Sequence, residues 1–244
     1  MKLVIDIGNT LAKIAVFNKS DIIDFKSIDM ISYSSIKQML DTYPDISTGI
    51  IASVREMDPD FFSFLDSNIR LMQLNEFTPL PFENNYKSPH SLGYDRIAAV
   101  AGASGIFQLD NVLVINAGTC ITYDVITAEN KYLGGGISPG IQMRFKALHT
   151  FTGKLPLIKP GIESTIDIIG NTTERSILSG VLNGVVCEID GIISSYKLQF
   201  PELKVIISGG DYKYFDKSLK NNIFASPNIV LTGLNRIHNF NEKK

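Results

Sequence analysis

A short segment near the start of the chain holds the residue types that a phosphate group and a metal ion need. Asp6 to Lys13 reads DIGNTLAK and contains a carboxylate, a glycine, a hydroxyl and an ammonium. Gly8, Asn9 and Thr10 are residue types that accept left-handed or strained backbone angles and leave backbone amides pointing outward. A carboxylate can hold Mg²⁺, amides and a hydroxyl can hold phosphate oxygens, and an ammonium can neutralise the remaining charge. The segment is therefore suited to a nucleoside triphosphate, with a plain β-hairpin and a capping aspartate as the alternative interpretation.

Strands on both sides of this turn are predicted to position it. The run at 3–5 is apolar and rich in β-branched residues, which favours a buried strand, and KIAVF at 13–17 predicts its neighbour. Residues 22–28 predict a third strand of an antiparallel meander. The elements expected next are a helix at 34–43, a parallel strand at 49–54, a helix at 58–65 and a strand at 69–74. Asp6 then lies in a buried strand, where a carboxylate is costly unless it serves a cation or a hydrogen-bond network.

A second carboxylate follows a long loop. The segment 76–93 contains three prolines and several polar residues, and long loops inside compact domains are usually functional. The alanine-rich stretch at 94–107 predicts a helix with Asp95 and Arg96 in its first turn. A carboxylate there is favoured by the helix dipole, so a surface pair of Asp95 with Arg96 is the alternative to a functional role.

The opening pattern of strand, polar glycine turn and strand returns in the second half of the chain. VINAGTC at 114–120 matches VIDIGNT at 4–10, with Gly118 in the place of Gly8, and strands are expected to follow at 123–126 and 131–133. A helix at 173–198 then precedes an apolar strand at 205–210. We interpret this as an internal duplication into two α/β halves, 1–110 and 111–244, each with a mixed sheet, and with an interdomain cleft that both turns face.

Composition narrows the class of protein. The 244 residues are 44% hydrophobic, which is ample for a core, and the formal net charge of −2 with no basic stripe argues against a nucleic-acid partner. No apolar stretch is expected to approach the length of a membrane span, and the first residues lack a signal-peptide pattern. The two cysteines and three histidines show no metal-ligand spacing. A cytoplasmic protein without a membrane partner is expected.

The duplicated architecture resembles the superfamily of actin, sugar kinases and acetate kinase, whose ribonuclease-H-like halves close on ATP and Mg²⁺. Within it, the order and spacing of several segments resemble the type III pantothenate kinase family. These segments are DIGNTLAK at 6–13, NYKSPHSLGYDR at 85–96, NAGTCIT at 116–122, GGGISPG at 134–140 and NTTERSILSG at 171–180. The resemblance implies ATP-dependent phosphorylation of pantothenate to 4′-phosphopantothenate, the first step of coenzyme A biosynthesis.

The resemblance also implies roles for individual residues. Asp95 would accept the proton of the pantothenate hydroxyl, and Asp6 would hold a metal ion. The ATP-binding residues would be Asp6, Ile7, Gly8, Asn9, Thr10, Leu11, Ala12, Lys13 and Thr119. The pantothenate-binding residues would be Tyr86, Gly93, Tyr94, Asp95, Arg96 and Thr173. Family members of this kind are expected to be homodimers in which the partner subunit completes the pantothenate pocket.

One position departs from the family pattern. Asn116 stands where the family usually has an aspartate that is associated with a monovalent cation such as K⁺ or NH₄⁺. An amide keeps a carbonyl oxygen but lacks the negative charge, so the affinity for such a cation should be lower. Two other functions stay open. One is a non-catalytic regulator similar to the Bvg accessory factor, and the other is a kinase of the same superfamily for another small hydroxylated substrate.

Overall fold

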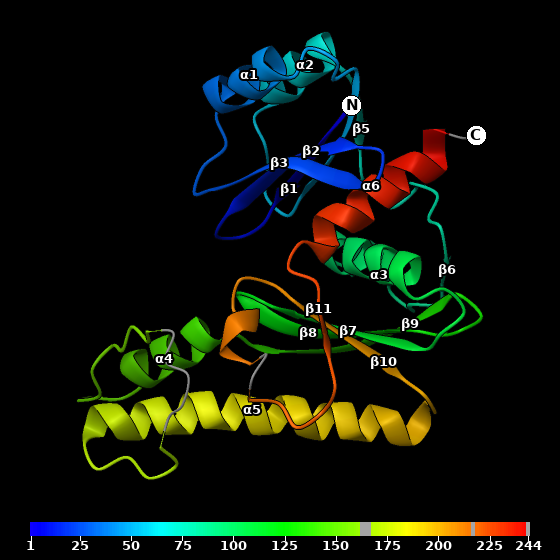
Figure 1. Ribbon diagram of the computed structural model, residues 1–244. Coiled ribbons are helices and arrows are strands. Elements are labelled where there is room, and N and C mark those ends of the chain that lie inside the picture. The colour runs from blue at the N-terminus through cyan, green and yellow to red at the C-terminus, as the bar shows by residue number, and fades with distance from the viewer. Residues whose placement is uncertain (162–166, 216–217, 243–244) are drawn as a thin grey trace. The chain divides into compact units, whose positions relative to one another are not determined.

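The computed structural model describes residues 1–161, 167–215 and 218–242, and the chain forms two compact units (Figure 1). Unit 1 contains Met1–Ile106, Asn130–Tyr132 and Ile229–Lys244. Unit 2 contains Phe107–Glu129 and Leu133–Asn228. The sequence predicted halves at 1–110 and 111–244; the observed units differ from them because the C-terminal helix and a short piece of a strand lie in unit 1.

Unit 1 is built on a five-stranded mixed sheet of order β3-β2-β1-β4-β5. Its strands are β1 (Lys2–Ile7), β2 (Ala12–Asn18), β3 (Asp21–Ile28), β4 (Thr48–Ser53) and β5 (Arg70–Gln73). The first three form the predicted antiparallel meander, and β4 pairs in parallel with both β1 and β5. The predicted strands of this half are therefore confirmed.

Helices cover both faces of this sheet, which explains why β1 is apolar along nearly its whole length. Figure 1 shows α1 (Tyr33–Thr42) and α2 (Pro59–Asn68) on one face and α6 (Ile229–Glu242) on the other. Ile36 and Met39 of α1 and Phe61 and Leu65 of α2 are buried in the core on their side of the sheet. The two helices begin within one residue of the predicted starts. Ser32 caps α1, and Asp58 accepts a hydrogen bond from the backbone of α2 ahead of Pro59.

The helices α3 (Tyr94–Ile106) and α6 approach each other through glycine. A Cβ atom on Gly233 of α6 would lie 1.6 Å from the carbonyl oxygen of Ala98, and one on Gly102 of α3 would lie 2.5 Å from the carbonyl oxygen of Ile229. Only glycine allows backbones to come this close. The position of α3, which carries Asp95 in its first turn, therefore depends on its contact with α6.

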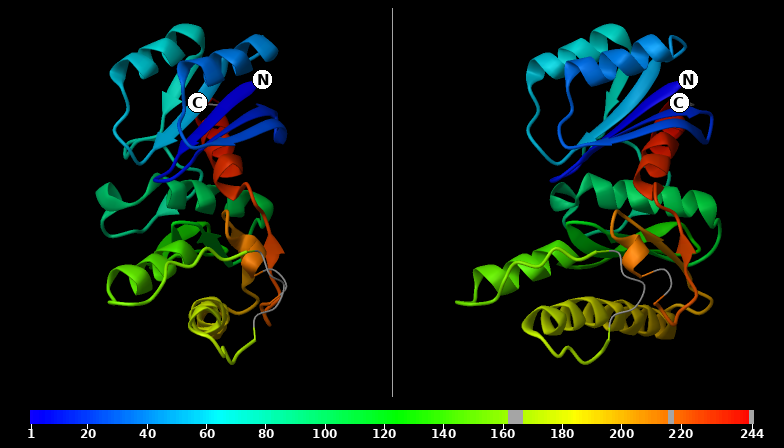
Figure 2. Two further views of the ribbon diagram at one scale, coloured as in Figure 1. Left: turned by 90° about the vertical axis from the view of Figure 1, so that its left-hand side faces the viewer. Right: turned by 60° about the vertical axis from the view of Figure 1, so that its left-hand side comes forward.

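Unit 2 contains a second mixed sheet in which the order is β11-β10-β7-β8-β9. Its strands are β7 (Val112–Ala117), β8 (Cys120–Ile126), β9 (Lys131–Pro139), β10 (Lys204–Ser208) and β11 (Phe224–Ala225). The helices α4 (Ile141–Thr150) and α5 (Thr173–Gln199) lie on one side of it (Figure 2). Ile141, Phe145 and the buried side of α5 pack with Leu113, Ile115 and neighbouring strand residues in the core of this unit.

Several elements differ from the predictions. The long loop at 76–93 contains a two-residue strand, β6 (Glu83–Asn84), and a single 3-10 turn at Pro89–Ser91, and a second 3-10 turn lies at Tyr212–Tyr214. The glycine run at 134–136 was predicted to follow a strand, but it lies inside β9. The helices α4 and α6 were not predicted.

The expectation about membrane spans needs a correction. By length and composition alone, α5 is long and apolar enough to cross a membrane. In the structure its buried residues, among them Val185, Ile189 and Ile193, pack in the core of unit 2. A core helix of a globular protein shows the same combination of length and apolar composition, so this finding is weak support for a membrane span.

Candidate functional site

The first glycine turn of unit 1 has the geometry of a tight connection between paired strands. The antiparallel register of β1 and β2 ends at the pair Ile7 and Ala12, and the backbone amide of Gly8 donates to the carbonyl oxygen of Leu11 at 3.0 Å. Asn9 and Thr10 at its tip are exposed. The turn therefore presents its polar residues to solvent at the edge of the sheet where β1 and β4 end.

Asp6 and Lys13 face each other across this hairpin, because they form a register pair of β1 and β2. Asp6 is only 9% exposed, and this burial raises the pKa of its carboxyl to about 6. The charge of Lys13 acts in the opposite direction, whereas the negative charge of Asp95 raises the pKa further. Two carboxylates and one ammonium from β1, β2 and α3 thus interact within unit 1, which the sequence predicted only as separate motifs.

Asp95 owes its position to the residue two places before it. Gly93 precedes α3, and its carbonyl oxygen accepts from the backbone amides of Arg96 and Ile97 at 3.1 and 3.2 Å. A Cβ atom on Gly93 would lie 2.5 Å from Oδ1 of Asp95. The Asp95 carboxylate therefore occupies the space that a side chain at position 93 would enter, and it would have to move if Gly93 were replaced.

Arg96 and Tyr86 are in direct contact. Arg96 is 5% exposed, and its guanidinium carbon lies 5.4 Å from the centre of the Tyr86 ring, which is cation–π geometry. Tyr86 comes from the long loop and Arg96 from the first turn of α3, so the loop closes back on the start of the helix. Of the predicted substrate residues, Tyr86, Gly93, Tyr94, Asp95 and Arg96 all belong to unit 1.

The second glycine turn lies in unit 2 and is one residue shorter than the first. The register of β7 and β8 ends at the pair Ala117 and Ile121, and the amide of Gly118 donates to the carbonyl oxygen of Cys120 at 2.9 Å. Thr119 at its tip is exposed. The amide of Gly140 donates to the carbonyl oxygen of Thr119 at 3.1 Å, so α4 begins against this turn. A helix N-terminus beside the turn adds a partial positive charge there.

A polar network holds α4 and α5 on the strands that follow this turn. Glu188 of α5 accepts hydrogen bonds from Tyr123 of β8 at 3.0 Å, from Ser138 of β9 at 2.6 Å and from Arg144 of α4 at 2.7 Å. Burial opposes ionisation of Glu188, but these three donors outweigh it and hold its pKa below the ordinary value. The network therefore fixes the start of α4 relative to the sheet.

Asp211 also lies beside the second turn, because its backbone amide donates to the carbonyl oxygen of Ala117 at 3.1 Å. Burial raises the pKa of its carboxyl from 3.8 to about 6. The folded state therefore binds this proton more tightly than the unfolded state, so the ionised carboxylate costs stability. The cost is absent below pH 3.8, grows as the pH rises from 3.8 to 6, and is complete above 6.

We expect Asp211→Asn to stabilise the protein at pH 7.5 by about 1 kcal/mol, a figure that is reduced for the partial exposure of the side chain. The difference from the unsubstituted protein should shrink toward zero as the pH falls to about 4. Urea unfolding at several pH values measures it. A loss of stability at pH 7.5, or a difference that does not change with pH, would show that burial of the charge is not the cause.

Thr173, the remaining predicted substrate residue, is the first residue of α5 in unit 2. It lines a cavity of about 1050 Å³ together with residues of α4 and of the segment before α5, among them Arg144, Leu148 and Asn171. Asn116 and Thr119 also belong to unit 2.

The residues present in unit 1 suit a divalent cation bound mainly through phosphate. In the part of the chain that the structure describes, no group of three His, Cys, Asp or Glu side chains gathers that could hold a metal ion. Mg²⁺ in phosphate-transfer sites usually takes only one or two carboxylates, with the remaining ligands from water and phosphate oxygens. Asp6 fits this use, because a cation would offset both its burial and its repulsion from Asp95.

Two residues beside the turns were missed in the sequence. Arg55 follows β4, and its guanidinium donates to the carbonyl oxygen of Asn9. Gly140 belongs to the segment GGGISPG at 134–140, but the start of a helix at this residue was not predicted. The parallel pairing of β1 with β4 could have predicted that Arg55 lies near the first turn, because the carboxyl ends of neighbouring parallel strands lie at the same edge of a sheet.

Comparison with known proteins identifies relatives over the full chain. A sequence model for the family described as type III pantothenate kinase matches residues 2–195. The type III pantothenate kinase of Christiangramia forsetii is 45% identical over 245 residues, which cover 99% of this chain and 99% of that relative.

Solved structures with lower identity share the fold. One from Campylobacter jejuni, whose description assigns it to a Baf family of transcriptional activators, is 21% identical with a TM-score of 0.65, covering 99% of this chain and 100% of that chain. The activator of 2-hydroxyisocaproyl-CoA dehydratase from Clostridium difficile, with bound ADPNP, is 14% identical with a TM-score of 0.53, covering 99% and 94%. These similarities and the two mixed sheets confirm the predicted α/β fold of duplicated ribonuclease-H-like units.

Proposed function

Because this chain belongs to the type III pantothenate kinase family, we propose that it transfers the γ-phosphate of ATP to the primary hydroxyl of pantothenate. The product would be 4′-phosphopantothenate, at the first step of coenzyme A biosynthesis. The observation that supports this proposal best is the interaction of Asp6, Lys13 and Asp95 beside the first glycine turn. Phosphoryl transfer requires charge neutralisation and a positioned acceptor for the hydroxyl proton, and these side chains can supply both.

The residues proposed to bind phosphate are Asp6 to Lys13 in unit 1 and, separately, Thr119 in unit 2. The exposed amides and the Thr10 hydroxyl of the first turn would contact phosphate oxygens, and Lys13 would neutralise part of their charge. Asp6 would hold Mg²⁺, which neutralises charge on the β- and γ-phosphates when bound. Arg55, which contacts the turn through Asn9, would add a second positive charge at its side.

The proton acceptor would be Asp95. The pantothenate hydroxyl oxygen attacks the γ-phosphorus, the bond to the bridging oxygen of ADP breaks, and the hydroxyl proton passes to the Asp95 carboxylate. Asp95 lies in the first turn of α3, where the helix N-terminus attracts negative charge.

Arg96 would bind the carboxylate at the other end of pantothenate. A planar guanidinium matches a carboxylate in two parallel hydrogen bonds, and its contact with the Tyr86 ring supports a fixed orientation. Gly93 and Tyr94 would contribute further contacts from unit 1, and Thr173 is the pantothenate contact proposed in unit 2.

A coupled assay for ADP formation tests the function. The intact protein with ATP and Mg²⁺ should form ADP only when pantothenate is added, and not with glucose or acetate as the acceptor. ADP formation with another acceptor but not with pantothenate would identify a different kinase of the superfamily. The same assay with K⁺ exchanged for Na⁺ tests the monovalent cation, for which we expect weak stimulation because Asn116 lacks a charge.

A regulatory function is the second candidate, because the Campylobacter jejuni structure is described within a Baf family of transcriptional activators. The intact Gly93 to Arg96 segment, with its carboxylate beside Asp6, supports catalysis instead. ATP binding without ADP formation, whatever the acceptor, would favour the regulator.

We also propose a cytoplasmic homodimer. The apolar residues of α5 are not available to a partner, because Val181, Val185, Ile189 and Ile193 are buried in the core of unit 2 and Ile192 is partly buried against it. Other apolar residues of unit 2, which are exposed, are better candidates for the interface. Phe151, Ile168 and Ile169 are 85%, 76% and 81% exposed, and they lie in the chain between α4 and the start of α5. Apolar side chains exposed to this extent favour burial against a partner.

A second copy of the chain would cover these residues and complete the pocket around Thr173. Sedimentation equilibrium should give twice the chain mass of 26.9 kDa at micromolar concentration. The single variant Phe151→Asp should shift the distribution toward the monomer, whereas Phe77→Asp, at an equally exposed phenylalanine of unit 1, should not. A monomer in the unsubstituted protein would refute the proposal.

A further inference from the structure

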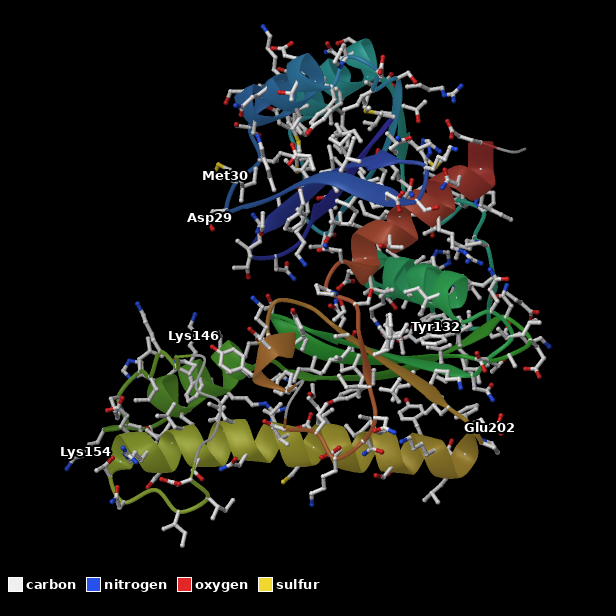
Figure 3. The ribbon with its side chains drawn as sticks, viewed as in Figure 1. Asp29, Met30, Tyr132, Lys146, Lys154 and Glu202 are labelled. Atoms are coloured by element: carbon white, nitrogen blue, oxygen red, sulfur yellow. The ribbon has the colours of Figure 1, made fainter. Side chains whose placement is uncertain are left out.

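Tyr132 is a buried aromatic residue that none of the assigned roles uses. It is the second residue of β9, it is 0% exposed, and it belongs to unit 1 although most of β9 does not. In Figure 3 it lies beneath α3, the helix that carries Asp95 and Arg96. Its place in the structure therefore connects it with the substrate loop rather than with the core of unit 2.

The ring of Tyr132 packs between two aromatic rings of the loop. Tyr86 is stacked on it with ring centres 6.0 Å apart and planes inclined by 18°. Phe82 meets it edge-on with centres 6.1 Å apart and planes inclined by 70°. The stacked neighbour, Tyr86, is the residue whose ring lies 5.4 Å from the guanidinium carbon of Arg96. Tyr132, Tyr86 and Arg96 thus form a continuous series of flat groups.

The backbone around Tyr132 also fixes the loop. Glu83 and Asn84 of β6 pair in parallel with Lys131 and Tyr132. The amide of Asn85 donates to the carbonyl oxygen of Tyr132 at 2.9 Å, so the chain is held immediately before Tyr86. The amide of Tyr86 itself donates to Oδ1 of Asn84 at 3.1 Å. Ring stacking and backbone pairing therefore act on the same residue.

We propose that Tyr132 is a positioning residue that sets the plane of Tyr86 and, through it, the orientation of the Arg96 guanidinium toward the substrate carboxylate. An arginine side chain has many rotamers, and fixing it in advance reduces the entropy lost when it binds an anion. The Tyr86 ring is stacked on Tyr132 and therefore offers a fixed surface against which the Arg96 guanidinium can be oriented. The inference rests on the proposed function, since it assumes that Arg96 binds the carboxylate of pantothenate.

The experiment replaces the ring and measures which substrate is affected. We expect Tyr132→Leu to raise the KM for pantothenate about tenfold, with kcat and the KM for ATP changed by less than about twofold. Tyr132→Phe keeps the ring and should stay within about threefold of the unsubstituted protein. Phe82→Leu is the matched control, because it removes the other ring that contacts Tyr132 and leaves the stack with Tyr86 in place.

A second measurement tests whether the effect of the substitution depends on the carboxylate of the substrate. Panthenol carries an alcohol in place of the carboxylate of pantothenate, so Arg96 has no anion to bind in it. Tyr132→Leu should reduce the preference for pantothenate over panthenol about tenfold, measured as the ratio of their dissociation constants. If both ligands weaken by the same factor, or if Phe82→Leu has the same effect as Tyr132→Leu, the role of Tyr132 is structural and the inference is wrong.

The outcomes also separate this inference from the function on which it rests. If the unsubstituted protein forms no ADP with pantothenate, the proposed function fails. If it does and Tyr132→Leu leaves the KM for pantothenate unchanged, only the inference fails. Should Tyr132→Leu not fold, Tyr132→Met takes its place, because methionine fills the site with a flexible side chain but lacks a flat surface.

Discussion

Asp95→Asn is expected to lower kcat by about two to four orders of magnitude while the dissociation constant of ATP stays within about twofold. Asparagine has the size of aspartate and still fits the space above Gly93, but it cannot accept the hydroxyl proton. The loss should therefore appear in the transfer step and not in nucleotide binding. Single-turnover phosphorylation of pantothenate and equilibrium titration with a non-hydrolysable ATP analogue measure the two quantities separately.

The matched control is Asp29→Asn, which removes an exposed carboxylate of unit 1 between β3 and α1 (Figure 3). It should leave both quantities unchanged. The free energy of unfolding of the Asp95→Asn protein should be lower by only about 0.5 kcal/mol, because a carboxylate in the first turn of a helix contributes about that much to stability. A folded Asp95→Asn protein with full activity would remove Asp95 from the role of proton acceptor.

Gly233→Ala is expected to reduce the free energy of unfolding by about 3 kcal/mol and to lower Tm by about 6–12 °C. The added methyl group would lie 1.6 Å from the carbonyl oxygen of Ala98, so α6 and α3 must move apart. Ala98 lies one turn after Asp95 on α3, and the displacement should therefore also reduce activity. Thermal unfolding followed by circular dichroism measures the first effect, and the ADP assay at a temperature where the variant is folded measures the second.

Gly191→Ala provides the comparison for this substitution. Gly191 is an exposed residue of α5, and a Cβ atom there would meet nothing within 4 Å. Since alanine favours the helix over glycine, this variant should be more stable by about 0.5–1 kcal/mol. If Gly233→Ala proved as stable as the unsubstituted protein, the close approach of α3 and α6 would not be a requirement of the fold.

The local structure around the two glycine turns was predicted well. Asp6 and Lys13 are joined by a short turn, and the alternation of the two flanking strands fixes which residues oppose each other. The same reasoning predicted the second turn at Gly118, because its flanking strands repeat the pattern. Caps such as Ser32 and Asp58 are also local signals, and the starts of the helices that they cap were predicted within one residue. The end of α2 was not, because this helix runs to Asn68 and the predicted end was 65.

The predictions failed where an element depends on distant partners. The helix α4 buries only Ile141 and Phe145, so its apolar pattern is weak, and contact with α5 and the sheet accounts for its position. The helix α6 follows the whole of unit 2 in the sequence, yet it packs in unit 1 against α3. The glycines at 134–136 were expected to follow a strand, but they lie within β9, where Gly134 has a positive φ of 99°.

The order of motifs determined the family, the fold class and the types of residue at the site, since each motif needs only neighbouring residues to form. The tertiary structure alone decided that Asp95 acts electrostatically on Asp6, that Arg55 reaches the first turn, and that Tyr132 supports Tyr86. Each of these pairs is separated by more than forty positions in the chain, so that only the packing of strands and helices brings them within range. Local pattern carries no information about such contacts, because burial and charge at a site depend on all the elements that surround it.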